Sequence, residues 1–376
     1  MIYRITLLFS IVCLLFSCNS GTDSAQQDNA SKMKYAELLS VSKKDSFTVV
    51  SISDPWHSGK VLHQYILVPK DQSVPRNLPK GDVIRTPLHS TAVFSSVHCG
   101  LLDEIGAFNT ITGVCDAQYI YMKKVQQALA TKSISDFGSS MAPNIEKIME
   151  RHPEAILLSP FENSGSYGKL GKVGITLIEC ADYMETSPLG RAEWIKFYGL
   201  LTGKERTADS IFSVVEANYN SIKARVAKEK TRPTVVTEMK SGNTWYIAGN
   251  RSTVGRLIAD AGGKYIFSDV NTSGSQPFSP EKAFMRAQKA DIWLIKYNYA
   301  TDMTKQALAD EWTSNKYMKA FTLGNVYGCN MAYARLFEET PFHPDIMLAE
   351  YANIFHPGLL KDYNNGGTKY YKRISK

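Results

Sequence analysis

The sequence lacks the residue patterns that mark common catalytic and nucleotide-binding sites. Gly-x-Ser-x-Gly, His-Glu-x-x-His and the glycine patterns that hold nucleotides are absent from its 376 residues. One stretch, residues 168–174, is glycine-rich, but it precedes an expected strand instead of joining a strand to a helix, which makes it a poor phosphate site. We therefore predict no catalytic residues and no enzymatic activity.

Cysteine is scarce and scattered, and no Cys-x-x-Cys pair or Cys–His cluster is present. A structural zinc site is therefore not predicted. In an oxidising compartment one or two disulfides would be compatible with the four Cys of the expected folded part, but the spacing does not fix a pairing. These four are Cys99, Cys115, Cys180 and Cys329.

A basic stripe is also missing. The formal net charge is +7, and the charges are spread along the chain, so no nucleic-acid partner is predicted. The only long apolar run is residues 5–16, which is too short to span a bilayer and fits the core of a signal peptide.

This run follows Arg4 and leads into Leu15-Phe16-Ser17-Cys18, which resembles a bacterial lipobox. The resemblance implies that residues 1–17 are a signal peptide and that Cys18 becomes the lipidated N-terminus. A plain signal peptide with an incidental Cys, or an uncleaved anchor, would also fit. We expect a lipoprotein of a bacterial membrane that faces the periplasm, with residues 18–46 as lipidated Cys and flexible tether, because residues 19–34 have almost no large apolar side chains.

The remaining chain reads as two lobes. Residues 47–68 look like two strands and a turn, and from residue 91 short apolar strands alternate with helices, which favours a parallel sheet covered on both faces. We predict an N-terminal lobe at 47–187 and a C-terminal lobe at 231–376.

Between the lobes, residues 188–230 read as linker helices. The first spans 188–201. The second, 205–228, repeats apolar residues at three- and four-residue steps and would be about 36 Å long, which favours a strut over a long surface helix. We expect the fold class α/β, with two lobes joined by a single long helix.

A repeat supports the two lobes. Asn144-Ile145-Glu146-Lys147 and Ser279-Pro280-Glu281-Lys282 each combine a helix N-cap residue, one spacer and Glu-Lys, and each precedes a short helix and a buried strand. A single Glu in a first helical turn is favoured by the helix dipole alone. Two matched Glu, one in each lobe, would suit a pseudo-symmetric membrane partner with basic pockets.

Four segments make a family resemblance specific. The chain resembles the binding proteins of ABC importers for iron–siderophore complexes, haem and cobalamin, and among these the cobalamin-binding members. The resemblance covers nearly the whole chain after about residue 90. It is carried by NIEKIMERHPEAILL, FSPEKAFMRAQKADIWL, VGRLIADAGG and ETSPLGRAEWIKFYGLLTGKE.

The family resemblance implies that the two lobes are doubly wound and Rossmann-like, with a ligand cleft between them. It also implies a monomeric binding protein that delivers a ferric siderophore, haem or cobalamin to an ABC permease dimer with its ATPase subunits. Glu146 and Glu281 would dock onto arginines of the permease. It implies no resident cofactor. The segment 47–68 replaces the family's usual beginning and has no assigned role.

Loops that follow strands should line the ligand cleft. Their aromatic residues would suit a flat or bulky organic ligand, although each could also be a packing residue. Arg191 could pair with an acidic ligand group, cap its own helix or pair with Glu185, and Trp56 and His57 occupy a turn without an assigned role. The candidate ligand residues are Tyr119, Tyr121, Phe161, Tyr167, Trp245, Tyr246, Tyr297 and Tyr299.

Two alternatives concern the ligand and the partner. Bare metal ions are the ligand of a related family, but His89, His98 and His152 form no tight cluster, so we expect surface or core histidines. The second functional hypothesis is a lipoprotein that binds a cofactor or metal ion for scavenging or sensing without a permease. Docking by Glu146 and Glu281 distinguishes the two hypotheses.

Overall fold

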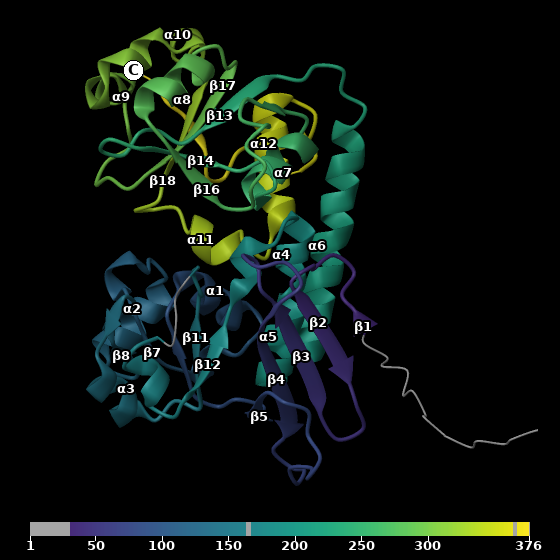
Figure 1. The fold of residues 1–376 in the computed structure, drawn as a ribbon. Helices are drawn as coiled ribbons and strands as arrows, with labels where there is room; N and C mark the ends of the chain where they lie inside the picture. Colours follow the sequence, from purple (N-terminus) through teal and green to yellow (C-terminus); the bar gives the residue numbers. More distant parts are fainter. Residues whose placement is uncertain (1–30, 163–166, 364–366, 376) are drawn as a thin grey trace, which may run out of the picture.

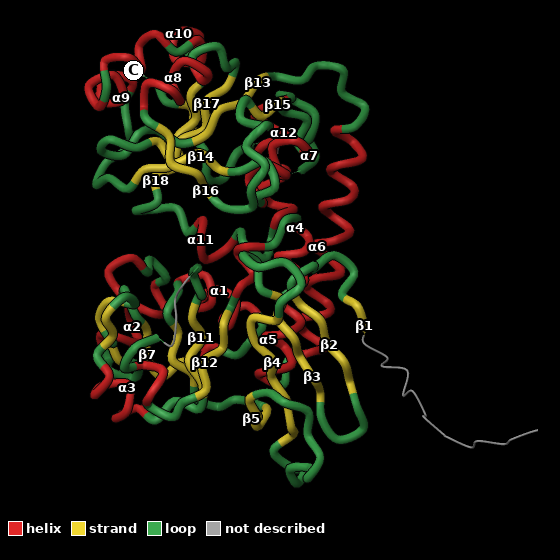
Figure 2. The backbone as a smooth tube through the Cα atoms, in the orientation of Figure 1, coloured by secondary structure: helices red, strands yellow, loops and turns green. Residues whose placement is uncertain are grey.

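Two lobes stand one above the other, and the long helix α6 (Glu205–Val226) runs along one side of both (Figure 1). This computed structural model describes residues 31–162, 167–363 and 367–375. The predicted signal peptide, Cys18 and the first part of the predicted tether, up to residue 30, lie outside the described residues. Within each lobe, strands form the inside and helices lie on either side of them (Figure 2). The predicted two-lobed α/β fold is confirmed.

An additional five-stranded sheet lies beside the N-terminal lobe. Its order is β1-β2-β3-β4-β5, antiparallel except for the parallel pair β4/β5. The predicted end of the tether at residue 46 is wrong, because Leu39 and Val41 lie two residues apart and point into the same buried face of β2. The strands are β1 (Ser31–Lys32), β2 (Leu39–Lys43), β3 (Thr48–Ser53), β4 (Val61–Pro69) and β5 (Asp82–Thr86).

The N-terminal lobe is built on a parallel sheet of order β12-β11-β6-β7-β8. All four residues of β11 are buried, as expected for a strand with helices over both faces. The strands are β6 (Thr91–Val93), β7 (Ile111–Val114), β8 (Ser135–Asp136), β11 (Ala155–Leu158) and β12 (Thr176–Glu179), with a small pair β9 (Gly138–Ser139) and β10 (Ala142–Pro143). The helices are α1 (Ser96–Glu104), α2 (Lys123–Ala130) and α3 (Ile145–Arg151).

Three helices link the lobes. The predicted single helix 188–201 is interrupted at Trp194, giving α4 (Pro188–Glu193) and α5 (Ile195–Thr202). Glu193, Trp194 and Ile195 at the interruption are all buried. Helix α6 has 22 residues and is about 33 Å long. Its predicted apolar stripe is confirmed, with Ala208, Phe212, Val215, Tyr219, Ile222 and Val226 buried.

The C-terminal lobe repeats the arrangement with the order β15-β13-β17-β18-β19, parallel except for β19. Its strands are β13 (Thr234–Thr237), β15 (Lys264–Tyr265), β17 (Ile292–Tyr297), β18 (Val326–Asn330) and β19 (Lys372–Arg373), and β14 (Trp245–Ala248) pairs with β16 (Ser275–Phe278) in a separate ribbon. The helices are α7 (Thr253–Asp260), α8 (Pro280–Ala287), α9 (Lys305–Glu311), α10 (Lys319–Leu323), α11 (Leu336–Glu339) and α12 (Pro344–Phe355).

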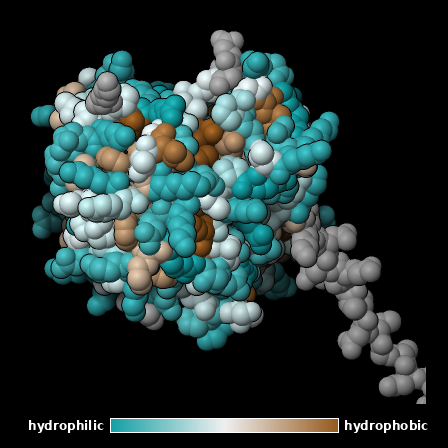
Figure 3. Space-filling model, turned by 90° about the horizontal axis from the view of Figure 1, so that it is seen from above, coloured by the Kyte–Doolittle hydropathy of each residue, from teal (hydrophilic) through white to brown (hydrophobic). Residues whose placement is uncertain are grey.

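The outer end of the C-terminal lobe is mostly hydrophilic, with small hydrophobic patches (Figure 3). In the described ranges, no helix combines the length and the apolar character needed to cross a membrane.

Candidate ligand-binding site

The loops at the carboxyl ends of the two parallel sheets meet between the lobes. The Tyr121 hydroxyl, after β7, donates to Asn298 Oδ1, after β17, at 3.3 Å. In doubly wound folds ligands bind outside the carboxyl ends of the strands. We call this region the inter-lobe junction, and it is the candidate ligand site.

Three of the predicted ligand residues are exposed on loops or edges. Tyr119 is 59% exposed, Tyr246 54% and Tyr299 39%. The Tyr299 hydroxyl donates to Glu311 Oε1 at 2.6 Å, and this hydrogen bond, together with burial, raises the pKa of Tyr299 to about 12. These aromatic faces are accessible to a ligand.

Two of the predicted ligand residues are core residues instead. Trp245 is fully buried, donates from Nε1 to the Thr237 carbonyl at 3.2 Å and packs against Trp293. Tyr297 is buried too, and its hydroxyl accepts from the Met303 N–H at 2.9 Å. In β14 alternation places Trp245 on the face opposite to the exposed Tyr246, and Tyr297 ends β17, a strand with almost every residue buried; the loop-based prediction considered neither.

Phe161 and Tyr167 lie in the loop after β11, and both line a pocket beside the N-terminal sheet together with Trp56 and His57. The structure therefore brings together two predicted ligand residues and two residues that the sequence left without a role.

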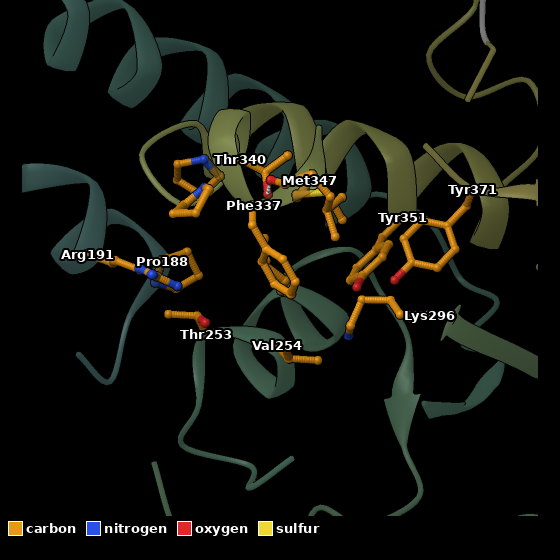
Figure 4. A pocket seen from close by; sticks show the side chains of 14 residues that line it. Pro188, Arg191, Thr253, Val254, Lys296, Phe337, Thr340, Met347, Tyr351 and Tyr371 are labelled. Carbon is orange, nitrogen blue, oxygen red and sulfur yellow. Dashed lines mark hydrogen bonds between the residues drawn. The ribbon is translucent and has the colours of Figure 1, made fainter. Parts of the chain in front are cut away.

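A small cavity lies between the linker helix α4 and the C-terminal lobe (Figure 4). Its volume is about 100 Å³, below the roughly 300–1,000 Å³ of typical ligand pockets. Phe337 points from α11 into it, and Arg191 and Lys296 are its cationic lining residues. In this conformation it has no room for a corrin, a porphyrin or a siderophore.

A buried charge cluster holds Arg191 at the wall of this cavity. Arg191 Nε donates to Asp182 Oδ2 at 3.0 Å, so its partner is Asp182 and not Glu185, which was one of the three alternatives left open by the sequence. Asp182 Oδ1 also contacts His98 Nε2 at 3.2 Å and accepts from the Tyr198 hydroxyl at 3.2 Å. Burial alone would raise the pKa of Asp182, but Arg191 and His98 lower it.

His98 is fully buried in the same cluster. Burial opposes its charged form, but Cys180 and Asp182 raise the pKa of His98 to about 10. The sequence predicted a core or surface histidine here and missed the cluster, because His98 and Asp182 are 84 positions apart and belong to no local motif.

Helix α11 fills the space between the lobes and was not predicted. The Tyr121 N–H donates to Glu338 Oε1 at 3.4 Å, and burial raises the pKa of Glu338. A Cβ at Gly100 of α1 would lie 2.1 Å from the Glu338 carbonyl oxygen, so only glycine allows this approach. Gly100 gives no signal of its own in the sequence.

A second ion pair lies at the carboxyl end of the C-terminal sheet. Lys296 Nζ pairs with Glu238, and although burial would lower the pKa of Lys296, Glu238 raises it. Lys296 also lines the small cavity, so it places a paired cation at the cavity wall.

The two glutamates that are predicted to dock each lie in the first turn of a short capped helix, one in each lobe. Asn144 accepts from the Lys147 N–H and caps α3, and Ser279 accepts from the Lys282 N–H and caps α8, as predicted. Glu146 and Glu281 are the acidic residues of the two first turns, and both are exposed. Helices α3 and α8 lie in opposite lobes on the side away from α6 (Figure 1).

The described residues contain no group of three or more His, Cys, Asp or Glu that could hold a metal ion. His89 and His152 are exposed, and His98 is buried. The four cysteines Cys99, Cys115, Cys180 and Cys329 are each free and buried, so they form no disulfide with one another.

Comparison with known proteins identifies the family. A family model described as periplasmic binding protein matches residues 92–332. An uncharacterized lipoprotein of Methanocaldococcus jannaschii is 29% identical over 313 residues, covering 79% of this chain and 73% of the relative. A cobalamin-binding protein of Halobacterium salinarum is 25% identical over 256 residues, covering 67% of this chain and 65% of the relative.

Solved structures share the fold. A periplasmic haem-binding protein of Pseudomonas aeruginosa aligns with a TM-score of 0.58 at 14% identity, over 72% of this chain and 94% of that one. A protein of an Fe³⁺-hydroxamate transport system from Saccharomonospora viridis aligns with a TM-score of 0.57 at 16% identity, over 72% of this chain and 94% of that one.

The family match covers more than half of the chain, and the chain belongs to the periplasmic binding protein family. The predicted resemblance is confirmed. The protein is a substrate binder of this type, a solute-binding class, and the names of its relatives place such proteins outside the cytoplasm.

Proposed function

We propose that this protein is the lipid-anchored substrate-binding component of an ABC importer and acts as a monomer. It captures cobalamin, a ferric siderophore or haem between its lobes and delivers the ligand to a membrane permease. Lipidation of Cys18 would hold it at the membrane face of the periplasm, and the relatives named lipoproteins support this. The cobalamin-binding relative and the haem-binding and hydroxamate-transport structures support the ligand class.

The observation that carries the proposal is the matched pair Glu146 and Glu281. Both carboxylates are exposed in first helical turns, and no described residue pairs with either. Carboxylates in this state are free to form bidentate contacts with arginines of a partner. One such group per lobe, on the same side of the molecule, fits a permease built as a dimer.

The test reconstitutes the permease and its ATPase subunits in liposomes and adds the ligand-loaded protein. We expect Glu146→Ala with Glu281→Ala to abolish stimulation of the ATPase and to leave ligand affinity unchanged. A matched control removes two other exposed carboxylates, Glu150 and Asp310, one in each lobe. Normal stimulation by the Glu146/Glu281 double variant would refute docking and favour a scavenging or sensing lipoprotein.

A further inference from the structure

A larger pocket lies between the N-terminal sheet and the N-terminal lobe, away from the small cavity. Its volume is about 570 Å³, within the roughly 300–1,000 Å³ of small-molecule sites. One wall is formed by the turn between β3 and β4 with the start of β4, and the other by β12 with Phe161, Tyr167 and Gly171. The first wall precedes residue 92, where the family match begins, so it is an addition to the matched region.

The added sheet is fixed to the lobe at the edge strand β12. The Tyr65 hydroxyl donates to the Leu177 carbonyl at 2.9 Å and accepts from the Glu179 N–H at 2.9 Å. The fully buried Tyr65 side chain thus forms hydrogen bonds with backbone groups of β12 that would otherwise have no partner at the edge of the sheet. The two walls of the pocket are therefore held at a fixed separation.

The turn that carries Trp56 is organised by Asp54. Asp54 Oδ1 accepts from the N–H groups of Trp56 at 2.8 Å and His57 at 3.0 Å, and Oδ2 contacts His57 Nδ1 at 2.9 Å. Such a side-chain-to-backbone turn fixes the direction of the following residues. Phe161, 48% exposed, lines the opposite wall. Aromatic faces on both walls suit an organic group packed between them.

The polar lining is acidic. His63 lies between two carboxylates, with Nδ1 2.9 Å from Glu179 Oε2 and Nε2 3.0 Å from Asp82 Oδ2, and the Tyr167 hydroxyl donates to Glu179 Oε1 at 2.6 Å. The described lining holds three carboxylates, two imidazoles and no Lys or Arg. Even with both imidazoles protonated, two positive and three negative charges leave a net charge of −1. The pocket therefore disfavours anionic groups.

We propose that this pocket is a ligand subsite that receives an uncharged or cationic group with hydrogen-bond donors, such as a carboxamide or an amine, against Trp56 and Phe161. Phe161 follows β11 and Glu179 ends β12, so both lie at the carboxyl end of the N-terminal sheet, which is the end that meets the other lobe. A ligand in the inter-lobe junction can therefore extend into the pocket. The inference rests on the proposed function. Because its lining is acidic, such a subsite favours cobalamin or a neutral ferric hydroxamate over haem, which carries propionates, and over an anionic ferric catecholate.

The test titrates the full chain with cyanocobalamin, a neutral ferric trihydroxamate, hemin and a ferric triscatecholate. We expect a neutral ligand to bind most tightly. Trp56→Ala should weaken its binding about tenfold or more, as loss of a central aromatic contact does. Trp56→Phe should keep most of the affinity but lose the share of the ligand-dependent fluorescence quenching that Trp56, one of five tryptophans, contributes. The control Tyr317→Ala removes an aromatic residue that is 73% exposed elsewhere and should change nothing.

Asp82→Asn tests the charge of the subsite. We expect it to raise the affinity for hemin relative to the neutral ligand about two- to fivefold, as expected for one partly exposed charge. If a ligand binds and neither Trp56→Ala nor Asp82→Asn changes its affinity, or if hemin or the catecholate complex binds the natural protein most tightly, the subsite is refuted while the proposed function stands. If none of the four ligands binds, the proposed function fails and the subsite with it.

Discussion

Glu193 attaches the first folded segment to the linker helices, and its removal should release that segment. Glu193 is 1% exposed, Oε1 accepts from the Lys34 N–H at 3.0 Å, and Oε2 accepts from the N–H groups of Tyr35 at 2.7 Å and Ala36 at 3.0 Å. In Glu193→Ala these three donors lose their acceptor. A buried unsatisfied donor costs about 1–3 kcal/mol, and only Ala36 is fully shielded from water, so we expect a total loss of about 2–4 kcal/mol.

Urea unfolding and hydrogen exchange measure this loss. We expect a lower unfolding free energy and faster exchange of amides 34–36, with unchanged ligand affinity, since these residues line neither pocket described above. Glu193→Gln keeps one carbonyl acceptor and should lose less. Glu150→Ala, which removes an exposed carboxylate, is the control. Unaltered stability and exchange in Glu193→Ala would refute this account of the attachment.

Two further predictions concern the contact between the lobes. Gly100→Ala should destabilise the protein by about 1–3 kcal/mol, because the new Cβ meets the Glu338 backbone. The control Gly274→Ala, whose Cβ would have nothing within 4 Å, should be nearly neutral in thermal unfolding. Equal melting temperatures of the two variants would contradict this prediction. Burial would lower the pKa of His343, but Asp345 and Glu104 raise it to about 9, so its stabilising contribution is complete below the unfolded value of about 6.5 and is lost as the pH rises to about 9. Urea unfolding at about pH 6.5 and about pH 9 measures how much unfolding free energy is lost between them. This loss should be smaller in Glu104→Gln than in the natural protein, and an equal loss would refute the role of the His343–Glu104 pair.

Local signals made much of the fold predictable. Asn144 and Ser279 cap their helices within three residues, and the apolar stripe of α6 repeats along one helix, so neighbouring residues contain the whole pattern.

Long-range contacts explain the errors. The segment after residue 33 folds because Glu193 and Glu185 accept its backbone N–H groups from about 150 positions away, which no local pattern reveals. The same limit hid the pocket beside the N-terminal sheet, since Trp56 and Phe161, about a hundred positions apart in the sequence, line it from different parts of the fold. The rule that aromatic residues after strands line a site does not distinguish exposed from packed side chains, because burial of Trp245 depends on strand facing and on Trp293, a partner distant in sequence.

An absorption titration shows whether the protein binds an iron chelate or cobalamin. The purified chain beginning at residue 19 is titrated with cyanocobalamin, hemin and ferric siderophores, and bound ligand is counted by equilibrium dialysis. We predict saturable binding of one of these ligands, with one molecule per chain and a shifted absorption spectrum. Absence of saturable binding for all of them would contradict the proposed function.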